Sequence, residues 1–159
     1  GITSFKIEGR MKSAYYTAAI TNAYKIALDD YFDGKEFDER CLRETESVSH
    51  REYGTGYFYS SPSTDANTVT INEYIADRPF YATVTEYDPE KKLAKCFQRN
   101  KMRTGEKANI LSPGHFGRDF VIGNMFDEEM NPIESTPHAG MVFYLEIDSA
   151  KSGDIIRGA

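Results

Sequence analysis

The pattern of apolar and polar residues along this chain of 159 residues first becomes regular after Ser13. Apolar side chains then recur every three or four residues, a spacing that places them on one face of a helix. Ser13 is a good N-cap residue, and Gly34 is typical of a helix end. We therefore predict a helix from about residue 14 to residue 32. Its packed surface would contain Tyr16, Ile20, Ala23, Tyr24, Ala27 and Tyr31.

Two shorter elements flank this helix. Residues 4–7 alternate in the manner of a short strand, and Gly9 marks a turn after them. Asp38 is suited to begin a second, short helix that extends to Glu46. The inward face of this second helix would carry Cys41, Leu42 and Thr45.

The second half of the chain has the period of two that is typical of strands. A polar stretch at residues 60–67, which we predict to be a loop, precedes it. In residues 79–87, Phe80, Ala82 and Val84 share one face. Short strands at intervals of roughly 8–12 residues predict an α+β chain that ends in a small antiparallel β-barrel. Further strands are expected at residues 93–98, 107–111, 119–126, 141–147 and 155–157, with a turn at residues 131–132.

Composition limits the classes of function. Hydrophobic residues make up 40% of the chain and charged residues 28%, as in an ordinary globular domain. The net charge of −6 argues against attraction of the whole surface to nucleic acid, although it allows a local basic face. No apolar run reaches the ~18–20 residues of a membrane-spanning helix, so we expect no membrane partner. Cys41 and Cys96 lack CxxC spacing, so we expect reduced thiols and a cytoplasmic protein.

The residues themselves do not predict a catalytic centre. His50, His115 and His138 are far apart in sequence, and no serine lies in a GxSxG context. The chain also lacks an HExxH motif, which would place two zinc ligands on one helix. We therefore expect no catalytic residue and no metal ligand in this chain.

Two groups near the helices are candidates for substrate binding. On a strand, Lys6 and Glu8 would share a face and pair, while Arg10 would point at an anion beyond the strand end. The alternative is a structural ion pair that seats the helix. His50 and Arg51 would contact an anion or substrate, or else His50 anchors a loop through hydrogen bonds.

The most basic segment lies between two predicted strands. It contains Arg99, Lys101 and Arg103, with Phe97 beside them. Cations next to aromatic rings can hold single-stranded RNA by phosphate contact and stacking. The alternative is a solvated hairpin end with no ligand.

Five separate segments resemble signatures of the collagenase-like peptidase family U32, in that family's order. The resemblance covers nearly the whole chain. The segments are FKIEGRMKS at residues 5–13, SHR at 49–51, QRNK at 98–101, PH at 137–138 and GDIIR at 153–157.

The resemblance implies a domain arrangement. Residues 1–34 would be the last strand and helix of an upstream catalytic TIM-like barrel, so the chain would be a piece of a longer protein. Residues 35–78 would be a linking helix and loops, and residues 79–159 a C-terminal β-barrel similar to those of translation factors. The family's cysteine-rich signatures, associated with metal or iron–sulfur ligation, would lie upstream, so we expect no cofactor in this chain.

The resemblance leaves the reaction open. The family is named for peptidases, yet several branches are linked to hydroxylation of RNA bases, including a transfer RNA uridine, and one pair to ubiquinone hydroxylation. We expect a non-catalytic accessory domain that binds or positions a peptide or RNA substrate for the upstream barrel. The alternatives are the tRNA-binding part of an RNA base hydroxylase, a structural or dimerisation module, and a peptidase in its own right.

Overall fold

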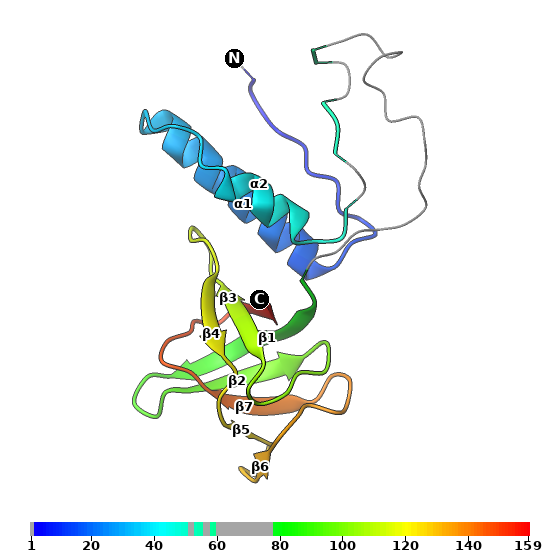
Figure 1. Cartoon of the computed structure of the whole chain (residues 1–159), viewed down its shortest axis with the longest axis vertical. Helices are drawn as coiled ribbons and strands as arrows, with labels where there is room; N and C mark the ends of the chain where they lie inside the picture. Colours follow the sequence, from blue (N-terminus) through cyan, green and yellow to red (C-terminus); the bar gives the residue numbers. More distant parts are fainter. Residues whose placement is uncertain (1, 51–52, 56–57, 60–77) are drawn as a thin grey trace.

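Two helices form one layer and an antiparallel sheet forms the other (Figure 1). The computed structural model describes residues 2–50, 53–55, 58–59 and 78–159. The predicted loop at residues 60–67 lies outside this range. No helix in the described ranges is long and apolar enough to cross a membrane.

The long helix is α1, Ala14–Phe32, and its predicted bounds are confirmed. The Ser13 hydroxyl accepts a hydrogen bond from the Tyr16 amide (3.2 Å), as an N-cap residue does. After the helix, Gly34 has a φ of 72°, a left-handed conformation that favours glycine. Local sequence signals are therefore sufficient to place both ends of this helix.

The predicted packed surface of α1 is wrong at two of its tyrosines. Tyr24 is 45% exposed and Tyr31 is 74% exposed. The helix instead buries the side that faces the sheet, where Tyr15 and Ala19 pack against Leu111 and Ile155. Spacing defines the possible faces of a helix, but the neighbouring elements decide which face is buried. The buried residues of α1 are Tyr15, Ala19, Ile20, Asn22 and Ala23.

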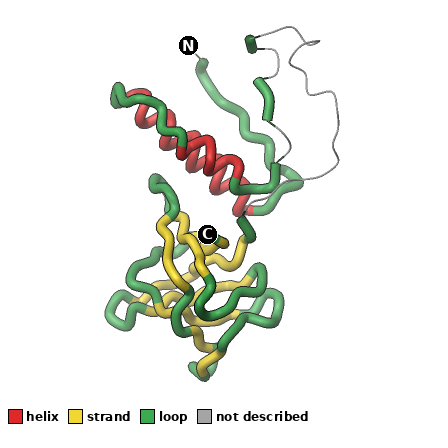
Figure 2. The backbone as a smooth tube through the Cα atoms, viewed as in Figure 1, coloured by secondary structure: helices red, strands yellow, loops and turns green. Residues whose placement is uncertain are grey.

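The two short elements beside α1 differ in part from their predictions. Residues 4–7 do not form a strand; they run as an extended loop, because no described strand lies beside them to complete a ladder (Figure 2). The short helix exists as α2, Arg40–Glu46, and Asp38 accepts a hydrogen bond from the Arg40 amide. Its buried residues are Cys41 and Glu44, whereas Leu42 is 51% exposed.

The eight strands form one antiparallel sheet that curls into a half-barrel, so the predicted fold class is confirmed. Their order across the sheet is β4-β3-β8-β1-β2-β7-β5-β6. The expected strand at residues 119–126 is split in two, and a short strand occupies the expected turn at Pro132. The bounds are β1 Phe80–Asp88, β2 Leu93–Gln98, β3 Lys107–Leu111, β4 Arg118–Val121, β5 Met125–Phe126, β6 Pro132–Ile133, β7 Val142–Glu146 and β8 Ile155–Gly158.

The inner face of the sheet forms the main hydrophobic core. Ala82 and Val84 of β1 are buried there, as their alternation predicted. They pack with Cys96 of β2, Phe143 of β7 and Ile156 of β8. Alternate residues of the same strands therefore point outward, and on β2 and β7 these are partly exposed.

A buried ion pair fastens the helices to the sheet. The guanidinium of Arg157 on β8 is fully buried and donates two hydrogen bonds of 2.7 Å to the two carboxylate oxygens of Glu44 on α2. Its Nε donates to Asn109 Oδ1 on β3 (2.8 Å). Burial is the largest single influence on Arg157 and opposes its charge, but the hydrogen bonds and charges of Glu44 and Tyr15 together outweigh burial, so the pKa of Arg157 is raised.

Candidate functional site

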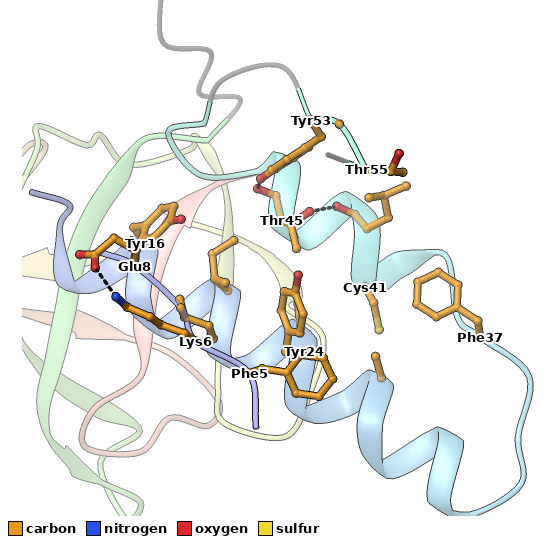
Figure 3. A pocket seen from close by; sticks show the side chains of 16 residues that line it. Phe5, Lys6, Glu8, Tyr16, Tyr24, Phe37, Cys41, Thr45, Tyr53 and Thr55 are labelled. Carbon is orange, nitrogen blue, oxygen red and sulfur yellow. Dashed lines mark hydrogen bonds and ion pairs between the residues drawn. The ribbon is translucent and has the colours of Figure 1, made fainter. Parts of the chain in front are cut away.

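A groove of 630 Å³ lies between the N-terminal segment and the two helices (Figure 3). Its floor is the side of α1 that the sheet does not cover. Phe5 lies against Tyr24 of α1, with ring centroids 6.1 Å apart. Phe37 and Leu42 form the opposite wall from the region of α2. The helical spacing of α1 therefore correctly identified an apolar face, but that face lines an open groove.

The Lys6 and Glu8 side chains stand at the rim of this groove. Lys6 Nζ lies 3.7 Å from Glu8 Oε2, and both side chains are exposed. Glu8 Oε1 also accepts a hydrogen bond from the Arg10 amide (3.0 Å). The predicted pairing thus occurs without the predicted strand, and Arg10 itself is exposed. In this arrangement the charge of Lys6 is matched, which leaves the groove mainly apolar.

His50 lies beside the groove but is held in place by its neighbours. Its Nδ1 lies 2.8 Å from the Val48 carbonyl oxygen, which can only accept, so this nitrogen carries the proton. The imidazole stacks on the Tyr53 ring at 4.7 Å, with planes 4° apart. Tyr53, which lines the groove, donates a hydrogen bond to the Thr45 carbonyl (2.7 Å). The neighbouring candidate, Arg51, lies outside the described residues.

One contact joins the two sequence motifs that flank the helices. Lys12 Nζ donates to the Ser49 carbonyl oxygen (2.8 Å) and to the Ser49 hydroxyl (3.2 Å). The segment at residues 5–13 is therefore tied to the segment at residues 48–50. Sequence reasoning singled out both motifs but not this contact, because 37 residues separate the two partners.

The basic candidates form a second site, between β2 and β3. The Arg99 guanidinium lies 4.9 Å from the centre of the Phe97 ring and 5.8 Å from that of Phe80. Asn100 donates a side-chain hydrogen bond to the Phe80 carbonyl (2.6 Å), which ties this connection to the start of β1. Lys101 and Arg103 are exposed. None of the three cations forms an ion pair with a residue in the described ranges. The expected hairpin end is wrong, because β2 and β3 are not neighbours in the sheet and the segment is a longer connection between them. We nevertheless use the name cationic hairpin for Arg99, Lys101 and Arg103.

Phe80 links the cationic hairpin to the helix layer but does not line the groove. Phe80 lies under Arg99 on one side and 5.4 Å from the Tyr15 ring of α1 on the other. Lys6 and Glu8 belong to the groove, and His50 reaches it through Tyr53. The structure therefore divides the sequence-predicted candidates into an apolar groove and a cationic hairpin.

Neither cysteine is suited to nucleophilic chemistry. Complete burial raises the pKa of the Cys96 thiol to about 12. Burial is also the main cause that raises the pKa of Cys41 on the groove wall. A thiol with a raised pKa holds little thiolate near neutral pH, and the thiolate is the nucleophile.

No three His, Cys, Asp or Glu side chains within the described ranges lie close enough together to hold a metal ion.

Comparisons with known proteins match both halves of the chain. A family model described as peptidase family U32 matches residues 1–68, and one described as peptidase family U32 C-terminal domain matches residues 77–157. A curated relative from Haemophilus influenzae, "tRNA hydroxylation protein P", is 30% identical over 149 residues, covering 92% of this chain and 32% of the relative. The "tRNA hydroxylation protein P1" of Bacillus subtilis is 25% identical over 151 residues, covering 93% and 36%.

This chain thus spans about a third of the length of these curated relatives. Among solved structures, the C-terminal domain of a U32 peptidase from Geobacillus thermoleovorans aligns with a TM-score of 0.47 at 25% sequence identity. The alignment covers 49% of this chain and 96% of that domain.

Proposed function

Because this chain belongs to peptidase family U32, we propose that it is the non-catalytic part of a tRNA hydroxylation protein and that it binds the substrate RNA. The names of the relatives from Haemophilus influenzae and Bacillus subtilis support the choice of RNA over peptide. The non-catalytic role is supported by the described residues, among which no serine or cysteine side chain hydrogen-bonds a histidine. Such a bond is what activates a nucleophile.

The cationic hairpin is the observation that carries this proposal. Its three cations have no carboxylate partner among the described residues, so their charge is available to phosphates. The Arg99 side chain packs against two aromatic rings. Because this packing already restricts the side chain, less conformational entropy is lost when a ligand binds it. A local basic site of this kind works on a chain of net charge −6, because exposed charges farther than ~10 Å apart are largely screened at 0.1 M salt.

The groove supports a second part of the proposal, which concerns the partner. We propose that the groove packs against the remainder of the parent protein, an upstream catalytic barrel. The exposed rings of Phe5 and Phe37 and the exposed Leu42 would be covered there. The support is that this chain spans only about a third of its relatives. By this proposal, residues 1–34 belong structurally to the upstream domain.

A salt titration tests the RNA-binding proposal. Binding of unfractionated transfer RNA is measured by fluorescence anisotropy at several salt concentrations, for the chain and for Arg99→Ala and Lys101→Ala. Each substitution should weaken binding and reduce the salt slope by about one, since one phosphate contact is lost. Thermal stability should hardly change, because an exposed cation contributes little.

The matched control is Lys151→Ala, which removes an exposed lysine from the turn before β8. It should leave both the affinity and the salt slope unchanged. Undetectable binding at low salt would overturn the proposal and favour a structural or dimerisation module. If Arg99→Ala unfolds the chain, Arg99 has a structural role and the proposal loses its main support. Turnover of casein by the purified chain would contradict the non-catalytic role.

A further inference from the structure

The outer face of the sheet carries three aromatic rings in one area. In the register of β2 and β7, Phe97 lies opposite Val142, and Lys95 lies opposite Tyr144. Tyr144 in turn lies opposite Phe126 of β5. Phe97 and Tyr144 are therefore diagonal neighbours on one face, with Phe126 next to Tyr144. We call these three side chains the outer aromatic face.

These rings are not part of the hydrophobic core. Their sequence neighbours Cys96, Phe143 and Leu145 point inward and are fully buried. The outer rings, in contrast, are only partly buried, and none belongs to the core cluster of the sheet. No described helix covers this face, since both helices lie at the β8 and β3 side of the sheet (Figure 1). Aromatic rings that are partly exposed on strands are available to a flat ligand.

The charge on this face changes from its centre, which is nearly neutral, to its Phe97 end, which is positive. Lys95, between the rings, is paired with Glu86 at 3.1 Å, so the centre of the face carries little net charge. At the Phe97 end, Arg99 lies over the ring and continues into the cationic hairpin. The face therefore leads from uncharged aromatic rings to unpaired cations, which matches a ligand with flat bases on one side and phosphates on the other.

A glycine allows the turn at the edge of this face. The loop at residues 137–140 comes up beside Phe97, and the Gly140 amide donates to Gln98 Oε1 (3.0 Å). Gly140 has a φ of +76°, and a Cβ built there would lie 3.5 Å from the tip of the Phe97 ring. Glycine is thus favoured by the left-handed turn, since a Cβ at that distance would make only an ordinary contact with the ring. The same loop presents the exposed His138.

We propose that the outer aromatic face stacks unpaired bases of an RNA strand, one on Phe97 and one on Tyr144, while the backbone runs toward Arg99. This inference rests on the RNA-binding function proposed above and specifies the form of the RNA. Sheets that carry aromatic rings on their strands bind unpaired bases in this way, whereas bases within a duplex are already stacked on one another. The recognised element is thus a loop or another single-stranded region.

The test compares Phe97→Leu and Tyr144→Leu with the unaltered chain. One probe is a uridine oligonucleotide of about twelve nucleotides, and the other is an abasic oligonucleotide of equal length. This length lies within the site sizes of small barrels that bind single strands. Leucine keeps an apolar side chain on the strand but cannot stack. Each substitution should weaken binding of the uridine oligonucleotide by about 5- to 150-fold and hardly affect the abasic one. Tyr31→Leu, which alters an exposed ring at the far end of α1, should change neither.

The outcomes separate this inference from the proposed function. If Arg99→Ala weakens binding but the two leucine variants do not, the RNA is held by its phosphates alone and the stacking inference fails. Equal binding of the uridine and abasic probes, or tighter binding of a duplex of the same length, would contradict it as well. If no RNA binds at low salt, both proposals fail. A circular dichroism melt of each variant distinguishes lost binding from lost folding.

Discussion

The groove and the cationic hairpin use the same kinds of side chain in opposite ways. In the groove, the cation Lys6 is matched by Glu8 at the rim and the aromatic rings form the lining. In the hairpin, aromatic rings support Arg99, whose charge stays free of any carboxylate among the described residues. The first arrangement offers apolar surface, and the second offers positive charge. Net charge and aromatic content of the whole chain therefore say little about what either region binds.

The groove belongs to the helix layer and the cationic hairpin to the sheet, and the Arg157–Glu44 pair joins these two layers. Replacing Arg157 by Met should lower the free energy of unfolding by ~3–5 kcal/mol, because the buried Glu44 carboxylate loses its partner. Urea denaturation measures this. The double variant Glu44→Met with Arg157→Met should recover much of the loss, since it leaves no unpaired buried charge. A single variant as stable as the original chain would show that the two layers do not depend on this pair.

A matched pair of tyrosine substitutions tests whether the groove side of α1 is open. Tyr15→Leu should cost ~1–3 kcal/mol, because it removes a buried ring paired with Phe80 and the hydrogen bond of the hydroxyl to Ser47. Tyr24→Leu, on the groove side, should stay within about 0.5 kcal/mol, as surface substitutions usually do. The melting temperatures of the two variants give the comparison. A large loss for Tyr24→Leu would mean that the groove is closed in solution.

Cysteine labelling compares the groove wall with the core of the sheet at one thiol each. Of the effects predicted here, we expect this one to be the smallest. At pH 8 in native conditions, a thiol reagent should modify Cys41 on the groove wall slowly, and Cys96 in the core only when the sheet unfolds. Both pKa values are raised, so less thiolate is present than in an unfolded chain, and labelling should accelerate as pH rises. Mass spectrometry after tryptic digestion identifies the labelled site. Equal labelling rates would indicate that the sheet opens as easily as the helix pair.

Much of the fold was predictable because its signals are local. The ends of α1 depend on Ser13 and Gly34, which are adjacent to the helix. β2 and β3 lie between turn signals in the sequence, at residues 88–91, at Gly105 and at residues 112–114. The buried face of α1 was not predictable in the same way, because it depends on which helix side meets Leu111 and Ile155. Residues 4–7 alternate like a strand but lack a described partner, which no local pattern reveals.

For the candidate sites, too, contacts between residues close in sequence were predictable and contacts between distant residues were not. The Lys6–Glu8 pair and the Arg99–Phe97 contact each join residues two positions apart, so spacing sufficed to suggest them. The Glu44–Arg157 pair joins residues 113 positions apart. The sequence shows a glutamate in a charged helix and an arginine in a short strand, with no sign that they meet. The outer aromatic face was likewise hidden, because it depends on the register of two strands that are not neighbours in sequence.

The position of β8 has a consequence for the order of assembly. This strand follows the others in sequence, yet it lies between β1 and β3 and pairs with both. A growing polypeptide that has not yet reached Ile155 would expose two unpaired strand edges, which are templates for aggregation. Long-range pairings of this kind also form slowly. Because β8 also carries Arg157, the pairing of the sheet and the ion pair with Glu44 on α2 both depend on this last strand.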